Sequence, residues 1–375
     1  MGTASPGTTC PSGKVCYGTV PDGGGNFFCN FQTGKCDPFD PCNGNSGTWS
    51  CNGTGSGGQT GGSTGGTVAI DPSGISFVVV GDTRPDSPGS PYPTQTIQAI
   101  FNDFSALSPK PMAVVATGDF QEEGDTNSYA EIQDYESAVA LFSSPTYPSM
   151  GNHECVSTSI TTCCGVSGPN SYNNTTAFSN FMQMLTDLNV PGTNGEPYYY
   201  ETLTAPNGDT AKFVVTAANA WDSTQASWFD GTLAVPSTFT FVARHEPDDA
   251  IGCSDSTPGD NTTSDCPYIA DVQTSINAHP GSVTLKLEGH THELRFDDAN
   301  DAIVSGGGGV AIEQTCSSNS TNTTYCNHGY VWCQERTDKT LLCTVYDAAS
   351  NSPVSAPPPR VAANGTPTGT LNYAN

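Results

Sequence analysis

The chain has 375 residues, of which 11 are Lys or Arg and 37 are Asp or Glu, so its formal net charge is −26. So acidic a surface repels nucleic acid and anionic membranes, and we exclude both as partners. No stretch approaches ~20 apolar residues, and we therefore expect no membrane-spanning helix. The 15 cysteines indicate an oxidising, extracellular compartment, although the first residues lack the features of a secretion signal, which we expect to be missing from this chain.

Residues 1–51 predict a small disulfide-rich module. They hold six cysteines among Gly, Pro, Asp and Asn: Cys10, Cys16, Cys29, Cys36, Cys42 and Cys51. A segment this poor in apolar residues needs cross-links, which three disulfides would supply, but the sequence does not choose among the pairings. A zinc knob is disfavoured because the module has no histidine and no close Cys-x-x-Cys pair.

The rest of the chain predicts a linker, one large α/β domain and a tail. Residues 52–67 are rich in Gly, Ser and Thr and predict a flexible linker, whereas residues 351–375 predict an extended Pro/Ala/Thr-rich tail. Between them, residues 68–350 alternate strand-like and helix-like patterns, which is typical of an α/β fold. The predicted strands are 75–80, 112–117, 212–216, 239–243, 283–287, 302–304 and 340–346. The predicted helices are 94–107, 128–142, 177–188 and one that Ser223 or Thr224 caps and that continues through Leu233.

Five short polar clusters each follow an apolar, strand-like run. They are Gly81-Asp82, Gly118-Asp119, Gly151-Asn152-His153-Glu154, His245 and Gly289-His290-Thr291-His292. Asp, Asn and His are ligands for divalent and trivalent metals, and the clusters contain four of the six histidines in the chain. In α/β folds, the carboxyl ends of strands surround the binding site. The clusters therefore indicate a metal-dependent hydrolase.

Each cluster alone has an ordinary structural explanation. A lone Asp after a strand is more often a turn or cap residue than a ligand. The occurrence of all five clusters in one order favours the metal site. The remaining histidines, His279 and His328, match no motif, and we expect them to be structural or exposed.

In the order of the clusters and in the residues that form them, residues 68–346 resemble the calcineurin-like metallophosphoesterases, and within them the purple acid phosphatases. The segment Val242-Ala243-Arg244-His245 is similar to a V-x-x-H element of that family, and residues 305–309 are similar to its glycine run. The resemblance implies a four-layer αββα sandwich. It also implies a secreted enzyme that hydrolyses phosphomonoesters, or less often phosphodiesters, by attack of a metal-bound hydroxide on a phosphorylated small molecule.

The resemblance further implies a centre with two ions of Fe, Zn or Mn, ~3.5–4 Å apart, bridged by Asp119. The other implied ligands are Asn152, His245 and His290 for one ion, and Asp82 and His292 for the other. His153 would protonate the leaving group or stabilise the transition state, and Glu154 would orient it.

Two departures affect the ion held by Asp82 and His292. Many relatives have D-x-H where this chain has Asp82-Thr83-Arg84, and purple acid phosphatases have Tyr where this chain has Glu122. Glu122 or Glu123 could substitute as a carboxylate ligand, and the alternative is a centre with one ion or none.

Arg84 and Arg244 lie beside motif residues in a chain with few cations. Either could bind a phosphate oxygen through its planar guanidinium. The alternatives are a salt bridge to one of the many carboxylates and, for Arg84, replacement of the absent metal in space and charge.

Nine cysteines belong to the large domain, so that one is left over from pairing. We expect Cys253 to pair with Cys266, Cys316 with Cys326, and Cys155 with Cys163 or Cys164. Seven Asn-x-Ser/Thr sequons make glycosylation an option. The aromatic residues Tyr198, Tyr199, Tyr200, Trp221 and Trp228 are candidates for a substrate pocket, although core packing is commoner.

Two other functions remain open from the sequence. The first is an extracellular structural or adhesive protein that reuses a degraded phosphoesterase fold and self-associates through its Cys-rich module or tail. The second is a binding protein that holds a phosphorylated or glycan ligand through one metal without turnover.

Overall fold

The computed structural model describes residues 68–122, 129–154, 175–247, 268–312, 323–363 and 371–373, together with three short strands nearer the N-terminus. The chain divides into two compact units, Met1–Gly66 and Thr67–Asn375. In the first unit, β1 (Thr3–Ala4) and β2 (Cys16–Gly18) each pair antiparallel with β3 (Trp49–Cys51). The predicted disulfides of this unit, and the predicted linker, lie outside the described part of the chain.

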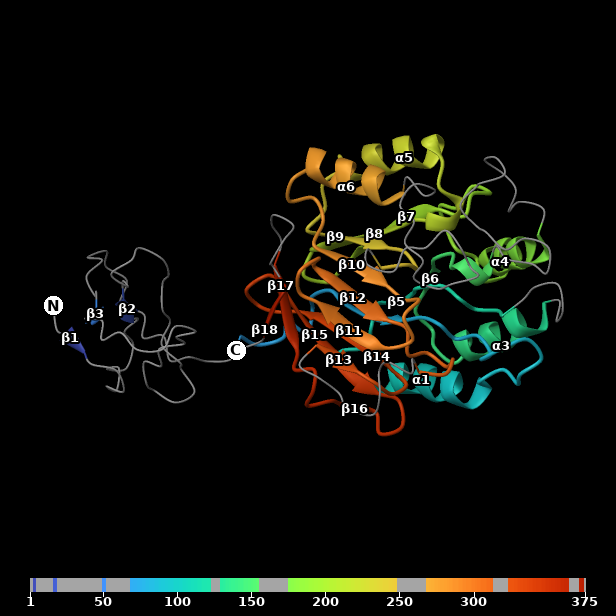
Figure 1. Cartoon of the computed structure of the whole chain (residues 1–375), viewed down its shortest axis with the longest axis horizontal. Coiled ribbons are helices and arrows are strands. Elements are labelled where there is room, and N and C mark those ends of the chain that lie inside the picture. Colours follow the sequence, from blue (N-terminus) through green and yellow to red (C-terminus); the bar gives the residue numbers. More distant parts are fainter. Residues whose placement is uncertain are drawn as a thin grey trace, which may run out of the picture. The chain divides into compact units, whose positions relative to one another are not determined.

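Two β-sheets form the second unit (Figure 1). The eight-stranded sheet has the order β18-β17-β15-β14-β4-β5-β6, with β16 paired to β15, and the seven-stranded sheet has the order β13-β11-β12-β10-β9-β8-β7. The strands of the first sheet are β4 (Ser76–Val80), β5 (Ala113–Ala116), β6 (Thr146–Pro148), β14 (Gly329–Glu335), β15 (Thr340–Asp347), β16 (Ser352–Pro353), β17 (Arg360–Ala363) and β18 (Asn372–Tyr373). Those of the second are β7 (Tyr199–Thr204), β8 (Thr210–Val215), β9 (Phe239–Ala243), β10 (Leu285–Glu288), β11 (Leu294–Asp297), β12 (Ala302–Ser305) and β13 (Thr324–Tyr325).

The strands that precede the polar clusters are parallel and buried. β4, β5 and β6 run parallel in one sheet, and β8, β9, β10 and β12 run parallel in the other. Every residue of β4, β5, β9 and β10 is buried, which explains the mainly apolar sequences of β4, β5 and β9, whereas β10 also buries the charged residues Lys286 and Glu288. The carboxyl ends of these strands carry the five clusters.

Aromatic residues fill the interface between the sheets. The ring of Phe77 on β4 lies 5.2 Å from that of Phe213 on β8 and 4.6 Å from that of Phe241 on β9, centroid to centroid. Because side chains alternate along a strand, Val214 and Val242 face the opposite side of their sheet. There they pack in a separate hydrophobic cluster with residues of α5 (Ser223–Leu233) and α6 (Tyr268–Ala278).

Helices cover the outer faces of both sheets and complete a four-layer αββα sandwich, as predicted (Figure 1). Beside α5 and α6, the helices are α1 (Thr94–Ala106), α3 (Ala130–Val139) and α4 (Thr176–Asp187). α1 packs through Phe104, whose ring lies 4.9 Å from that of Tyr330 on β14. None of the described helices combines the length and apolarity that a membrane crossing needs.

The N-terminus of α5 differs from the prediction. Asp222, rather than Ser223 or Thr224, is the cap, because its Oδ1 accepts hydrogen bonds from the backbone N–H groups of Thr224 and Gln225 at 2.9 and 2.8 Å. Such an acceptor satisfies N–H groups that have no partner within the helix.

Part of the predicted extended tail, residues 351–375, belongs to the first sheet, because β17 pairs with β15, and β18 pairs with β17. Arg360 on β17 is fully buried and donates from Nε to Asp298 at 2.8 Å. Its guanidinium also lies over the ring of Phe296 on β11, at 5.1 Å. Arg360 therefore joins the end of one sheet to the other, which composition alone did not reveal.

One disulfide of the large unit was not predicted. Cys333 and Cys343 are bonded across β14 and β15, where they are directly opposite in register with Cα atoms 4.1 Å apart. Cys326 is also disulfide-bonded. Its predicted partner Cys316, and the other predicted pairs, lie outside the described residues.

Replacement of Phe213 by Ala should lower the free energy of unfolding by about 3–5 kcal/mol, because it leaves a cavity between the two sheets. Urea denaturation measures the change. The control is Tyr200→Ala on neighbouring β7, where the side chain is 43% exposed, and we expect a loss below about 0.5 kcal/mol. Equal losses in the two variants would contradict the packing of aromatic rings between the sheets.

Candidate metal centre

Backbone hydrogen bonds bring the loops after the parallel strands together. The N–H of Asp82, after β4, donates to the carbonyl oxygen of Gly118, after β5, at 3.0 Å. The N–H of Gly289, after β10, donates to the carbonyl oxygen of His245, after β9, at 2.7 Å. The N–H of His290 then donates to Oδ2 of Asp82 at 2.9 Å and so joins loops from both sheets.

Three candidate ligands have a backbone conformation that side chains disfavour. Asp82, Asp119 and His290 have φ angles of 58°, 58° and 69°, in the left-handed region, which costs roughly 1–3 kcal/mol each. Gly118 precedes Asp119 with φ 94°, and a Cβ there would lie 2.7 Å from Nδ1 of His245. The glycines of the motifs thus allow the close approach of side chains, and the strained residues point to function.

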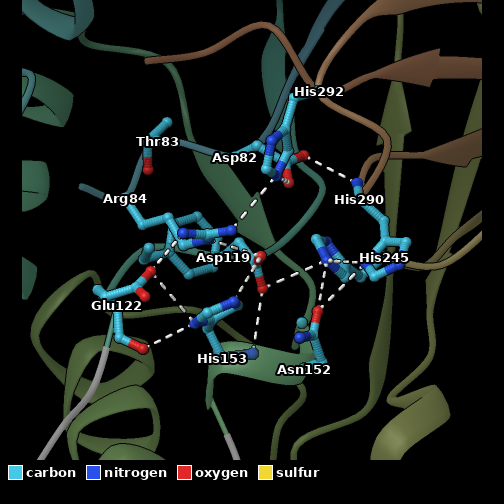
Figure 2. A network of polar contacts seen from close by, with 12 residues as sticks. Asp82, Thr83, Arg84, Asp119, Glu122, Asn152, His153, His245, His290 and His292 are labelled. Atoms are coloured by element: carbon cyan, nitrogen blue, oxygen red, sulfur yellow. Dashed lines mark hydrogen bonds and ion pairs between the residues drawn. The ribbon is translucent and has the colours of Figure 1, made fainter. Parts of the chain in front are cut away.

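Four donor atoms converge in what we call the donor cluster: Oδ1 of Asp119, Oδ1 of Asn152, Nε2 of His245 and Nδ1 of His290 (Figure 2). Nε2 of His245 lies 3.1 Å from the Asn152 atom, 3.2 Å from the His290 atom and 3.2 Å from the Asp119 atom. The Asn152 and His290 atoms are 3.2 Å apart. Donors about 2.1 Å from one ion, in tetrahedral or octahedral arrangement, lie about 3.0–3.4 Å from each other.

The tautomer of His245 supports a cation in the donor cluster. Its Nδ1 donates to the carbonyl oxygen of Thr117 at 2.6 Å, so Nε2 of the neutral imidazole is an acceptor. That acceptor faces two oxygen acceptors, from Asn152 and Asp119, and a bound cation would turn these repulsive contacts into coordination.

The electrostatics of the site favour positive charge at the same place. Burial acts to lower the pKa of His245, but the carboxylates of Asp119 and Asp82 outweigh it and raise this pKa well above its usual value. Burial acts to raise the pKa of Asp119, but His245 and His153 hold it well below its usual range. Either a proton on His245 or a metal ion would supply the charge that these groups stabilise.

Asp82 provides a further oxygen. Its Oδ1 is buried and has no hydrogen-bond partner among the described residues, and it lies 3.6 Å from Nε2 of His292. Burial raises the pKa of Asp82 well above its usual value. One ligand atom from each of Asp82, Asp119 and His245 lies within 4.8 Å of the others. An orphaned carboxylate oxygen beside the donor cluster fits a metal centre.

Arg84 lies on the other side of Asp119 (Figure 2). Its Nε donates to Oδ2 of Asp119 at 3.1 Å, and its Nη1 forms an ion pair with the carboxylate of Glu122. Its Nη2 lies 3.3 Å from Nε2 of His292. Glu122, predicted as a substitute ligand, thus contacts Arg84 in this structure. Burial raises the pKa of Glu122 to about 7, although Arg84 opposes this effect.

His153 is beside the donor cluster, and its side chain is 18% exposed. Its Nδ1 donates to the carbonyl oxygen of Glu122 at 2.7 Å, and its backbone N–H donates to Oδ1 of Asp119 at 3.2 Å. Burial, together with Arg84, lowers the pKa of His153 to about 4. His153 therefore lies next to Asp119, and the hydrogen bond to Glu122 fixes the orientation of its ring.

Glu154 does not orient His153, contrary to the prediction. Its carboxylate accepts from the backbone N–H groups of Asp119 at 2.9 Å, Phe120 at 2.8 Å and Gly151 at 2.7 Å. Burial raises its pKa to about 7. Glu154 therefore holds the backbone of Asp119 in place, a long-range role that the spacing Asn-His-Glu did not reveal.

Arg244, predicted to bind substrate, is fully buried and bonds to Glu288 instead, with Nε at 3.0 Å from Oε1. Arg244 comes directly after β9, which is buried beside β10, and its side chain therefore lies against Glu288 of β10. The sequence also missed Thr117, whose carbonyl oxygen orients His245; its position directly before Gly118-Asp119 was the available signal.

The aromatic residues form packing contacts and hydrogen bonds among themselves and with neighbouring elements. The hydroxyl of Tyr199 donates to the carbonyl oxygen of Pro148 at 2.9 Å, and Tyr198 packs on Trp228 at 4.8 Å. The indole of Trp221 donates to Asp271 at 3.0 Å. His279, as expected, lies near the surface, beside Asp230 at 3.1 Å.

The sequence matches the family of calcineurin-like phosphoesterases over residues 75–294. Since the match covers more than half of the chain, this protein belongs to that family. Comparison with curated proteins finds no match.

Solved structures with this fold include a purple acid phosphatase from yellow lupin (Lupinus luteus) seeds, at 15% identity and a TM-score of 0.51. The alignment covers 75% of this chain and 52% of the lupin protein, so this chain spans about half the length of that relative. A dimetal phosphatase from Danio rerio is 14% identical over 74% of this chain and 97% of its own, with a TM-score of 0.47. An anchor protein of the Plasmodium inner membrane complex is 12% identical over 78% and 89%, with a TM-score of 0.45.

Replacement of Glu154 by Gln should destabilise the protein by about 1–3 kcal/mol, because an amide N–H₂ would face buried backbone N–H donors. Urea denaturation measures the loss, and reduced metal uptake should accompany it. The matched control is Glu196→Gln at an exposed position, with an expected change below about 0.5 kcal/mol. A Glu154→Gln variant as stable as the control would refute the backbone role of Glu154.

Proposed function

We propose that this protein is an extracellular metal-dependent phosphoesterase that hydrolyses phosphomonoesters. The observation that carries the proposal is the donor cluster, in which Nε2 of His245 lies 3.1 Å from Oδ1 of Asn152 and 3.2 Å from Oδ1 of Asp119. Family membership makes phosphoester hydrolysis the chemistry to expect of such a centre. Diesters are the less favoured substrates.

The donor cluster would hold the metal through Asp119, Asn152, His245 and His290. A bound ion of Fe, Zn or Mn would supply Lewis acidity toward a phosphate oxygen and a lowered pKa for coordinated water. The residues do the positioning: Thr117 fixes the ring of His245, and Glu154 fixes the backbone of Asp119. Such preorganisation lets the ligands bind an ion without rearrangement.

His153 would donate to the oxygen of the leaving group. With Nδ1–H directed at the carbonyl oxygen of Glu122, Nε2 carries a proton only in the protonated imidazole. The pKa of about 4 therefore favours proton transfer from Nε2 in acid, which fits an acid phosphatase. The partial exposure of the ring gives substrate access to it.

The extracellular part of the proposal is supported by the disulfides. Cys333 and Cys343 are bonded, and Cys326 is bonded too. Disulfides persist in oxidising compartments and are rare in reducing ones.

Replacement of His153 by Ala should lower kcat for p-nitrophenyl phosphate by about 10²–10⁴-fold, because the leaving group loses its proton donor. Steady-state kinetics over a range of pH measures this, and the rise of kcat that we expect as the pH falls toward the pKa of His153, about 4, should disappear in the variant. The control is His279→Ala, which removes a histidine outside the site and should leave kcat unchanged. An unaffected His153→Ala variant would exclude this residue from catalysis.

Removal of metal should abolish hydrolysis of p-nitrophenyl phosphate, because no other group in the donor cluster can replace a cation as Lewis acid. The assay follows the reaction after dialysis against a chelator and after readdition of Mn²⁺, Zn²⁺ or Fe²⁺. Activity that survives complete removal would contradict the proposal. Absence of turnover with every metal would favour the alternative of a structural or adhesive protein.

A further inference from the structure

The two oxygens of Asp119 face two different sources of positive charge. Oδ1 belongs to the donor cluster, 3.2 Å from Nε2 of His245. Oδ2 accepts from Nε of Arg84 at 3.1 Å. The bridging carboxylate therefore has an ion-binding side and a guanidinium side (Figure 2).

The guanidinium of Arg84 lies at three of the four groups that a second ion would need; the fourth, Asp82, has its Oδ1 3.6 Å from Nε2 of His292. Besides Oδ2 of Asp119, it contacts the carboxylate of Glu122 and lies 3.3 Å from Nε2 of His292. By the resemblance, Asp119 would bridge the two ions and His292 would bind this ion. Glu122 occupies the position of the Tyr ligand of purple acid phosphatases. An ion bound there would share its ligands with Arg84.

Arg84 is also anchored by backbone oxygens, apart from the side chains of these ligands. Its Nη1 donates to the carbonyl oxygen of Pro85 at 3.0 Å, and its backbone N–H donates to the carbonyl oxygen of Asp119 at 3.1 Å. Its side chain is only 9% exposed. The position of the guanidinium is therefore determined by the loop as well as by the carboxylates.

We infer that the guanidinium of Arg84 permanently replaces one of the two metal ions, so that the centre takes a single ion, held in the donor cluster. The inference rests on the proposed function and specifies its cofactor, which is one divalent metal ion next to the guanidinium of Arg84. A guanidinium does not lose its proton in proteins, and its planar array of donors suits a carboxylate on each side. It satisfies Asp119 and Glu122 without a second metal, and its charge repels one.

The geometry of the donor cluster indicates which of the two implied ions this protein binds. Its four atoms come from Asp119, Asn152, His245 and His290, none of which except Asp119 contacts Arg84 in the interactions described above. His292, by contrast, lies at the guanidinium. Loss of His290 and loss of His292 should therefore have different effects on metal content.

The test measures the Mn²⁺ content of the intact chain after chelation, reloading and desalting, by mass spectrometry of the metal. We expect one equivalent, with the electron paramagnetic resonance spectrum of an isolated Mn²⁺ ion. His290→Ala should lose the ion, and His292→Ala should retain it. Mn²⁺ is chosen because it prefers O and N ligands and does not compete for cysteine sulfur.

The Arg84→His variant tests the inference from the opposite direction. It removes the guanidinium and restores the D-x-H sequence of many relatives. This variant should take up a second equivalent and show the spectrum of two exchange-coupled ions. The matched control is Arg336→Met, which also removes one positive charge but lies where β14 joins the turn to β15, at the amino end of β4. It should retain one equivalent. A thermal melt of each variant establishes that the protein is folded.

Two equivalents in the unaltered chain would overturn the inference and leave the proposed phosphoesterase intact. A single ion that His292→Ala removes and His290→Ala retains would also overturn it, as would an Arg84→His variant that is folded and stays at one equivalent. No uptake of Mn²⁺, Zn²⁺ or Fe²⁺ by the unaltered chain would overturn the inference and the proposed function together.

Discussion

The carboxylate of Asp119 is the group on which the candidate centre depends, because it joins two regions of opposite character. One oxygen faces the nitrogen of His245 and the other faces the guanidinium of Arg84. To reach both, the residue has a left-handed backbone conformation, follows a glycine, and has its N–H group held by the buried carboxylate of Glu154. The buried parallel strands on either side supply the rigidity that offsets this local strain.

The sequence predicted the parts of the structure that follow from local pattern. β4, β5 and β9 are short, mainly apolar runs that end in a polar cluster, so their position and the direction of their carboxyl ends were evident from the residues alone. The resemblance to the phosphoesterases then supplied the pairing of two sheets, which periodicity does not encode. The loops that carry the candidate ligands lie near one another for the same reason, since each follows a strand of one of the two sheets.

The features that the sequence did not predict all depend on distant contacts. Arg360 is separated by 62 positions from Asp298, and Glu154 by 35 from the N–H of Asp119. In both cases the folded chain buries a charged residue against a partner that is distant in the sequence. Likewise, Arg244 looked available for phosphate until the pairing of β9 with β10 placed it beside Glu288.

The position of β4 has a consequence for how the protein is made. β4, which leads to Asp82, pairs on one side with β14, and Trp332 on β14 donates to Ser76 on β4 across 256 positions of the chain. During synthesis, β4 therefore leaves the ribosome long before the strand that covers its edge. Until then β4, whose residues 77–80 are all apolar, presents an open edge, which other chains can pair with. The candidate ligands themselves extend from Asp82 to His292, so they can come together only after most of the domain has been translated.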